Sequence, residues 1–308
     1  MRKITVGEND NEQRLDRFLS KYLPGAEKSY LQKMVRKKRI KLNGKKASSD
    51  AIIKTGDYIN FYIYEEELEK FEQSKKIKTS KINLQIIYRD GNIAVIDKPV
   101  GILSHAAKKA DYGNNIADAF ESLLIETGEY VPRLEKSFKP AIANRLDFNT
   151  AGLIIGLKNH AAAMTINEAL KNRKIDKYYL AFCKGRIEKS ISIDKNLDKQ
   201  GKNMRVSDEG KHALTLVKPL KIYDDASLVE VKLMTGRYHQ IRAHMASIGH
   251  PLIGDRRYGR AEASFDHQLL LAYKLKFKLI EGLEYLNNLQ VKSKQEEKFI
   301  RAYEANII

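Results

Sequence analysis

A charged segment in the first third of the chain, EEELEKFEQSKKIKTSK (residues 65–81), limits how the sequence can fold. It contains few apolar residues, so it offers little surface to a hydrophobic core, and this composition is typical of a linker or a loose helix. The whole chain has 308 residues, which is enough for two domains at about 150 residues each. We therefore expect two folded units, residues 1–66 and 82–308, joined by a linker over residues 67–81.

The first unit carries local signals for helices, a turn and a strand. Apolar residues with helical spacing predict an amphipathic helix over residues 13–23, and a second helix should begin near Ser29, a candidate N-cap. Asn43-Gly44 indicates a turn, because both residues tolerate positive φ. The alternating stretch YINFYIY (residues 58–64) predicts a strand, so the unit is a small α/β domain.

The same unit is strongly basic. Nine Lys and Arg residues and no Asp or Glu lie between Lys28 and Lys46, in a chain whose formal net charge is +17. A solvated charged helix is the alternative, but unbalanced positive charge on a helix and a turn favours contact with nucleic-acid phosphates. The candidate RNA-binding residues here are Lys33, Arg36, Lys37, Arg39, Lys45 and Lys46.

The second unit mixes strands with helices. Two strands are predicted around Asp90-Gly91, a short hairpin signal, and further strands over residues 153–157, 177–185 and 227–234. A helix with Asn159 as N-cap is predicted over residues 159–173, and another over residues 235–251 with three apolar residues facing inward, Ile241, Met245 and Ile248. Strands joined by hairpin turns, with helices between them, indicate an α+β fold and not a regular βαβ repeat.

Several classes of site are disfavoured. The chain has no glycine pattern of a phosphate-binding loop or dinucleotide fold. His239 and His244 are five residues apart, about 140° on a helix, so we interpret them and His250 as structural or RNA-contacting and expect no metal. The single cysteine, Cys183, lies in an apolar strand and is expected in the core, as in a reducing cytoplasm. We see no signal peptide and no membrane span.

One acidic residue, Asp147, stands out because it lies just before a strand predicted to be buried. A carboxylate in such a place must be hydrogen-bonded or paired. Arg242, next to the inward stripe of its helix, is a plausible partner. The residues alone leave a structural salt bridge as the alternative to a catalytic pair, and spacing does not decide between them.

Four segments occur in the order of successive motifs of a known family: IDKPVGILSH, NRLDFNTAGL, DKYYLAFCKG and MTGRYHQIRAHMASIGHPLIGDRRYG, within residues 82–280. They closely resemble the RluA family of RNA pseudouridine synthases. RLDRFL, LQKMVRKKRIKLNGKKA and KTGDYI in the first unit resemble the S-four-type RNA-binding domain found ahead of many such enzymes. The resemblance implies a catalytic domain over residues 82–308 with the pseudouridine synthase fold, a mixed and mainly antiparallel sheet flanked by helices and loops.

The resemblance also implies the chemistry. Such enzymes isomerise a uridine within RNA, using an aspartate and neither cofactor nor metal, and the matching residues are Asp147, Tyr179 and Arg242. The aspartate is the nucleophile or base, and attack on ribose carbon 1′, attack on uracil carbon 6 and a glycal route stay open. The tyrosine packs against the base, and a guanidinium beside a carboxylate favours its charged form. Three further motif residues, His105, Arg145 and Arg237, are candidates for loop structure or RNA contact.

Three positions differ from residues common in the family, namely Asn144, Ala151 and Leu271. We expect Asn144 to keep a hydrogen-bonding role and Ala151 to fit a tight turn. The substrate expected from the first unit and the charge is large-subunit ribosomal RNA. The alternatives are a transfer RNA, or a non-catalytic RNA-binding or ribosome-assembly protein with the same fold. RNA is the implied partner, and we expect a monomer in the cytoplasm.

Overall fold

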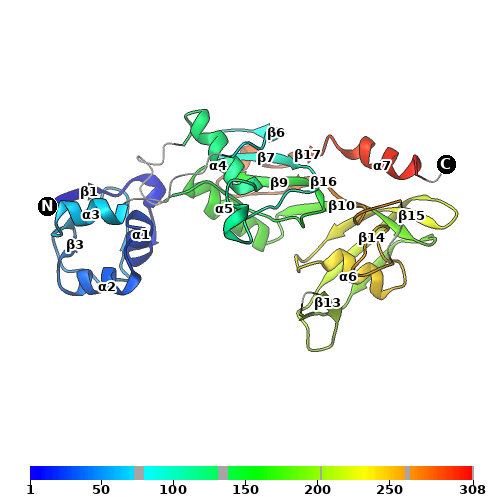
Figure 1. Ribbon diagram of the computed structural model, residues 1–308, viewed down its shortest axis with the longest axis horizontal. Helices are drawn as coiled ribbons and strands as arrows, with labels where there is room; N and C mark the ends of the chain where they lie inside the picture. The colour runs from blue at the N-terminus through cyan, green and yellow to red at the C-terminus, as the bar shows by residue number, and fades with distance from the viewer. Residues whose placement is uncertain (73–79, 131–137, 202, 261–263, 307–308) are drawn as a thin grey trace.

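The computed structural model describes residues 1–72, 80–130, 138–201, 203–260 and 264–306. An N-terminal unit and a larger unit follow one another along the longest axis of the molecule (Figure 1). Residues 73–79 of the expected linker lie outside the described residues. Within the described part, none of the helices has the length and apolar character needed to cross a membrane.

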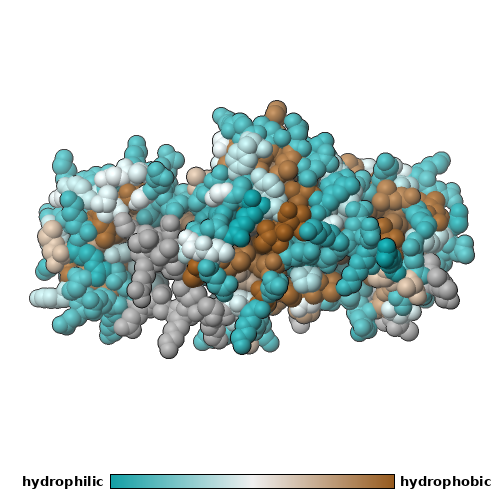
Figure 2. Space-filling model, turned by 90° about the horizontal axis from the view of Figure 1, so that it is seen from above, coloured by the Kyte–Doolittle hydropathy of each residue, from teal (hydrophilic) through white to brown (hydrophobic). Residues whose placement is uncertain are grey.

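The N-terminal unit packs three helices against short strands around a core of its own. Three strands pair in the order β1-β5-β3, and β2 pairs with β4. Figure 2 shows hydrophilic side chains over most of this unit's visible face. Its elements are β1 (Arg2–Thr5), a 3-10 turn (Glu8–Asp10), β2 (Gln13–Arg14), α1 (Leu15–Tyr22), α2 (Lys28–Arg36), β3 (Ile40–Leu42), β4 (Ile52–Ile53), β5 (Tyr58–Phe61) and α3 (Glu65–Glu72).

The first helix begins later than its apolar spacing predicts. Gln13 and Arg14 pair as a strand with Ile53 and Ile52, so α1 begins at Leu15 and not at residue 13. This pairing joins residues about forty positions apart, which local periodicity does not detect. The second helix begins at Lys28, with Glu27 and not Ser29 in the N-cap position. The predicted strand over residues 58–64 is shorter, because β5 ends at Phe61.

The segment between the two units starts as a helix. Residues 65–81 were expected to form a linker or a loose helix, and α3 occupies the first eight of them. Leu68 is fully buried in the N-terminal core and Phe71 packs against it. The helix therefore extends the N-terminal unit beyond residue 66. The N-terminal unit also contacts the larger one, because the backbone N–H of His160 donates to Asn9 Oδ1 (3.2 Å).

A ten-stranded sheet forms the centre of the larger unit. Eight strands follow the order β11-β14-β15-β10-β16-β9-β7-β6, with β17 paired to β16 and β8 to β9. The pairing of β16 with β9 is parallel and the other pairings are antiparallel, so the predicted mixed, mainly antiparallel α+β fold is confirmed. Its strands are β6 (Ile86–Arg89), β7 (Ile93–Lys98), β8 (Ala141–Ile142), β9 (Ala151–Leu157), β10 (Ile175–Lys184), β11 (Ile191–Asp194), β14 (Leu214–Ile222), β15 (Ala226–Leu233), β16 (Leu270–Phe277) and β17 (Gln290–Lys292), beside a separate pair, β12 (Leu197–Gln200) and β13 (Asn203–Val206).

Four helices accompany this sheet, α4 (Ile116–Glu126), α5 (His160–Lys171), α6 (Gln240–Ser247) and α7 (Glu296–Glu304). The predicted N-cap of α5 is confirmed, because Asn159 Oδ1 accepts from the N–H of Ala162 (2.8 Å). The predicted helix over residues 235–251 is much shorter. The Gln240 side chain accepts from the Arg237 backbone N–H (2.9 Å), and His239 has φ 49°, so the preceding residues form a tight loop and α6 begins at Gln240.

Candidate active site

Asp147 lies in the loop between β8 and β9, and buried polar groups fix this loop on both sides of it. Lys98 is fully buried, and its ammonium donates to the carbonyl oxygens of Pro99 (2.9 Å), Ile102 (2.9 Å) and Phe148 (3.1 Å). Ser104 Oγ donates to the carbonyl of Leu146 (2.8 Å) and accepts from its N–H (3.0 Å). The backbone of both neighbours of Asp147 is therefore tied to the segment that follows β7.

The Lys98 ammonium also has an electrostatic role. Burial lowers the pKa of Lys98 to about 8, and the negative charge of Asp147 opposes this shift. Lys98 therefore holds the loop by hydrogen bonds and also places a positive charge close to Asp147.

The three departures from common family residues have local explanations. Asn144 Nδ2 donates to the Leu153 carbonyl (3.1 Å) and its Oδ1 accepts from the N–H of Ile155 (2.9 Å), which confirms its hydrogen-bonding role. Ala151 begins β9 instead of sitting in a turn, and it pairs with the fully buried Leu271 of β16. The neighbouring Gly152 has φ 115°, and a Cβ there would lie 2.1 Å from the Ala272 carbonyl oxygen. Small residues let β9 and β16 approach closely at this end of the loop.

Arg242 joins Asp147 to a second, deeper carboxylate. Its Nη1 donates to Asp147 Oδ2 (3.0 Å), so the predicted pair is present. Its Nε and Nη2 donate to Asp255 Oδ2 (2.7 Å) and Oδ1 (2.9 Å). The side chain of Asp255 is 0% exposed and that of Asp147 is 27% exposed. The buried Asp255 thus holds the guanidinium in place, and Nη1 of the same guanidinium contacts the partly exposed Asp147.

Arg242 and Asp255 determine each other's ionisation. Burial lowers the pKa of Arg242, but its bonds to Asp255 and its attraction to both aspartates outweigh burial and raise that pKa above its ordinary value. Burial raises the pKa of Asp255, and the bonds from Arg242 outweigh it and leave that pKa below its ordinary value. Both groups are therefore charged at neutral pH. Bidentate pairing also fixes the direction of the guanidinium plane.

His239 belongs to the same cluster, which its sequence position does not reveal. Its Nε2 lies 3.2 Å from Arg242 Nη1 and 3.4 Å from Asp147 Oδ2, and its Nδ1 lies 3.0 Å from Tyr258 Oη. The ring stacks on Tyr238, with a centroid distance of 3.7 Å. Burial lowers the pKa of His239 to about 4, with Asp147 acting in the opposite direction. A neutral imidazole therefore borders the Asp147 carboxylate at neutral pH.

Tyr179, in β10, closes the apolar side of the site. It is 7% exposed and belongs to the same core cluster as Leu146 and Ile241. Burial raises the pKa of Tyr179 well above its usual range, and the negative charge of Asp147 acts in the same direction. The hydroxyl is therefore neutral and lies within the electrostatic reach of the aspartate. Tyr178, the neighbouring alternative, belongs to a different core cluster and has Lys274 over its ring.

The predicted RNA-contacting residues have exposed side chains, and Arg145 and Arg237 lie close to members of the aspartate cluster along the chain. His105, Arg145 and Arg237 have solvent-exposed side chains, and Arg237 Nε donates to the His212 carbonyl (3.0 Å). The six basic residues of the N-terminal unit are also exposed. Four of them lie in α2 or between α2 and β3, and Lys45 and Lys46 follow β3; Figure 1 draws this unit on the opposite side from α6. The structure thus brings together Asp147, Arg242 and Tyr179 and leaves the other nine on the surface.

The other histidines and the cysteine have structural surroundings. His244 is fully buried between Thr215 Oγ1 (2.9 Å) and the Lys195 carbonyl (3.1 Å). His250 Nδ1 lies 2.7 Å from the Lys184 carbonyl. Cys183 is in the core, as predicted, and burial raises the pKa of its thiol. Among the described residues, no three His, Cys, Asp or Glu side chains are grouped so that they could hold a metal ion.

Comparison with known proteins identifies the family. Residues 92–247, half of the chain, match the family described as RNA pseudouridylate synthase, and residues 13–59 match the S4 domain. The chain belongs to the RNA pseudouridylate synthase family. Its activity is accordingly that of an RNA pseudouridine synthase, and the N-terminal unit is an S4 domain, both as the sequence motifs predict.

Relatives agree over most of the chain. An uncharacterized RNA pseudouridine synthase of Aquifex aeolicus is 33% identical over 84% of this chain and 81% of its own length. The ribosomal large subunit pseudouridine synthase D of Nitrosomonas europaea is 31% identical over 84% of this chain and 72% of its own length. The solved structure of human RNA Pseudouridylate Synthase Domain Containing 4 has the same fold, with a TM-score of 0.56, 20% identity and coverage of 72% and 92% of the two chains.

The sequence gives no role to Lys98 and Asp255, and it gives His239 only a structural or RNA-contacting one. Lys98 and Asp255 lie inside the family-like motifs IDKPVGILSH and GDRRYG, but nothing in their spacing relates them to Asp147. His239 precedes Arg242 by three residues, the spacing of neighbours on one helix face. That spacing is the one sequence signal for a contact between His239 and Arg242.

Proposed function

We propose that Asp147 is the catalytic group of this RNA pseudouridine synthase and that it works without a cofactor. The observation that supports this role is its setting: a partly exposed carboxylate beside Arg242, which a fully buried Asp255 holds in place. A purely structural salt bridge needs only one carboxylate for one guanidinium. Here the buried Asp255 already satisfies Arg242 bidentately, so Asp147 is available for a substrate.

The isomerisation breaks the bond between uracil N1 and ribose C1′ and forms a bond between C5 and C1′. The proton on C5 is lost and N1 gains one, so the atoms balance without an added reactant. Asp147 acts as nucleophile or base, at ribose C1′, at uracil C6 or in an elimination through a glycal. Arg242 keeps its carboxylate oriented when substrate excludes water. Tyr179 packs against the detached uracil; such stacking is worth about 1–3 kcal/mol.

The substrate proposed is large-subunit ribosomal RNA. Two kinds of observation support it: relatives at about 30% identity named ribosomal large subunit pseudouridine synthases, and an S4 domain with an exposed basic helix. The target uridine must leave its stack at a cost of a few kcal/mol, which phosphate contacts elsewhere on a large RNA offset. We further propose that the enzyme acts as a monomer in the cytoplasm, where such RNA is made. A transfer RNA is the alternative substrate.

Release of tritium from RNA labelled at uridine C5 tests the proposal. Purified wild-type protein should release tritium from large-subunit ribosomal RNA transcribed in vitro, without added metal or cofactor. Asp147→Asn should bind the same RNA with little change and release none. If Asp147→Asn keeps substantial activity, the aspartate role is wrong. If wild type releases tritium from transfer RNA and not from ribosomal RNA, the substrate proposal is wrong.

A further inference from the structure

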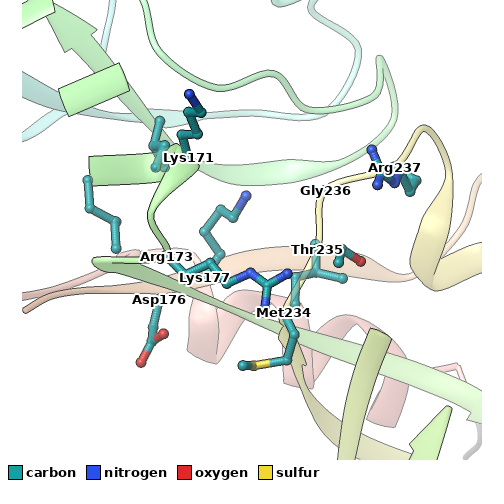
Figure 3. Close-up of a pocket in the computed structure, with 11 residues that line it drawn as sticks. Lys171, Arg173, Asp176, Lys177, Met234, Thr235, Gly236 and Arg237 are labelled. Carbon is teal, nitrogen blue, oxygen red and sulfur yellow. The ribbon is translucent and has the colours of Figure 1, made fainter. Parts of the chain in front are cut away.

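A basic pocket of about 280 Å³ opens between the end of α5, β10 and the loop that leads into α6 (Figure 3). Lys171 and Arg173 contribute to it from the carboxyl end of α5, Lys177 from β10 and Arg237 from the loop that leads into α6. Of the described residues that line it, Asp176 alone is acidic. The pocket is therefore a concentration of positive charge that no catalytic role explains.

Asp176 does not neutralise this charge. It leaves β10 on the opposite side from Lys177 (Figure 3), as successive residues of a strand do. Its carboxylate is paired with Lys232 Nζ (2.9 Å) and Lys278 Nζ (2.8 Å). Because two lysines already surround this single carboxylate, it does not neutralise the cations that line the pocket.

Lys177 is the central cation. Burial lowers the pKa of Lys177, and no neighbouring charge compensates for it. In the part of the chain that the structure describes, its ammonium has neither a hydrogen bond nor an ion pair. Gly236 lies beside it, because a Cβ at this glycine would lie in ordinary van der Waals contact with Lys177 Nζ, at 3.5 Å. A partly desolvated ammonium without a partner is stabilised by an anion that enters from outside.

The contributions of the four cations differ. Lys171 and Arg173 lie at the carboxyl end of α5, where positive charge stabilises any helix through its macrodipole. Lys177 lies on a strand and Arg237 in a loop, so helix stabilisation explains neither. These two residues carry the argument for a ligand, and the two from α5 add to the positive potential.

The position of the pocket identifies the anion. Lys177 precedes Tyr179 by two residues in β10, which corresponds to about 7 Å along the strand. Arg237 precedes His239 by two residues in the loop that continues into the helix of Arg242. The pocket is thus next to the catalytic cluster along both segments. A backbone phosphate near a uridine held at Asp147 is the anion that fits this position.

We propose that this pocket binds a backbone phosphate of the substrate RNA adjacent to the target uridine, with Lys177 as its principal contact and Arg237 at its edge. The contact fixes the strand while the detached uracil turns, and it requires no bond to form or break. This inference rests on the proposed function, because it takes the uridine to be held at Asp147.

The test compares Lys177→Met with Lys177→Arg and with Lys298→Met, which removes an exposed lysine of α7 that does not line the pocket. Tritium release from labelled large-subunit ribosomal RNA gives kcat and KM. Lys177→Met should raise KM about tenfold, as expected for a lost charge-assisted contact, with kcat within about twofold of wild type. Lys177→Arg should recover most of the loss, and Lys298→Met should match wild type.

Binding is measured in an Asp147→Asn background, so that turnover does not interfere. Adding Lys177→Met should reduce the slope of log K against log salt by about 0.7, the value for one phosphate contact on a single strand. An unchanged slope and KM would overturn the proposal, as would a lower kcat with unchanged binding, which would place Lys177 in the chemistry. If Lys177→Met does not fold, the same salt dependence of RNA binding is measured for Arg237→Gln, and its slope should likewise decrease.

Two further measurements separate a free phosphate from an RNA phosphate, and the pocket from the proposed function. Inorganic phosphate and uridine 5′-monophosphate serve as free-phosphate probes. If Lys177→Met weakens their binding and leaves RNA binding unchanged, the pocket takes a free phosphate and the proposal is wrong. If Asp147→Asn keeps its activity, the proposed role of the aspartate fails, and the salt slopes still decide the pocket.

Discussion

Replacement of Asp255 by Asn should lower kcat and the stability of the protein, although we place Asp255 behind Arg242 and out of contact with the substrate. Asp255 is fully buried and accepts four N–H donors: Nε (2.7 Å) and Nη2 (2.9 Å) of Arg242, and the backbone N–H groups of Arg257 (3.0 Å) and Tyr258 (3.2 Å). None of these donors can become an acceptor. An asparagine therefore places its amide N–H groups against fixed N–H groups and leaves the guanidinium without its buried counter-charge.

The expected magnitude follows from this geometry. Breaking a buried ion pair by removing one partner costs about 3–5 kcal/mol, which corresponds to a fall in melting temperature of about 10 °C. Because Arg242 then loses its bidentate support, Asp147 loses its fixed orientation, and a misplacement of about 1 Å can reduce kcat by about 100-fold. Thermal unfolding followed by circular dichroism and tritium release well below the melting temperature measure the two effects separately.

Asp97→Asn is the matched control. Asp97 is also buried, 1% exposed, and accepts from Ser293 Oγ (2.9 Å), the Lys294 N–H (2.8 Å) and Gln295 Nε2 (2.6 Å). The hydroxyl and the amide can turn and accept instead, so this variant should lose less stability and keep its activity. Wild-type kcat in Asp255→Asn, or an equal loss of activity in Asp97→Asn, would refute the reasoning.

Three further predictions concern the loop, the histidine and the basic helix. Lys98→Met removes the tie to the Phe148 carbonyl and should lower kcat by about tenfold or more with little change in KM; an unchanged kcat would show that the tie is dispensable. The pKa of His239 is about 4 when folded and 6.5 ordinarily, so the unfolded chain takes up this proton first as the pH falls. Wild type should lose up to about 3 kcal/mol more stability than His239→Gln between pH 7 and 4 in urea titrations, and parallel curves would contradict this. Replacing three exposed cations by Gln should flatten the salt dependence of RNA binding by about 2, whereas an unchanged slope would remove α2 from the RNA interface; the three are Lys33, Arg36 and Lys37.

Signals that involve neighbouring residues were readable from the sequence. The hairpin at Asp90-Gly91 is confirmed, because Asp90 Oδ1 accepts from the N–H groups of Asn92 (2.6 Å) and Ile93 (2.8 Å). Two of the three inward residues predicted for the helix over residues 235–251 are confirmed, with Ile241 and Met245 buried, whereas Ile248 follows the end of α6 and is partly buried. Turns and helix faces depend on a few successive residues, so composition and spacing are sufficient for them.

Features that depend on contacts between distant segments were not readable. The strand pairing of Gln13 and Arg14 with residues 52–53 shortens α1, and helical periodicity contains no trace of it. Asp147 and Arg242 are 95 residues apart, and their pairing was a plausible guess that only family motifs made specific. Asp255 and Lys98 act through the partners that the fold brings to them. The left-handed backbone at His239 made the helix begin later than predicted, at Gln240, and the His239 ring lies next to Asp147.

The central claim is that Asp147 performs the isomerisation in RNA, and mapping pseudouridines across the transcriptome tests it most directly. A strain lacking this protein is compared with the same strain carrying wild type or Asp147→Asn at equal protein levels. We predict that one or more large-subunit ribosomal RNA positions lose pseudouridine in the deletion strain, regain it with wild type and stay unmodified with Asp147→Asn. Restoration of these positions by Asp147→Asn would contradict the account.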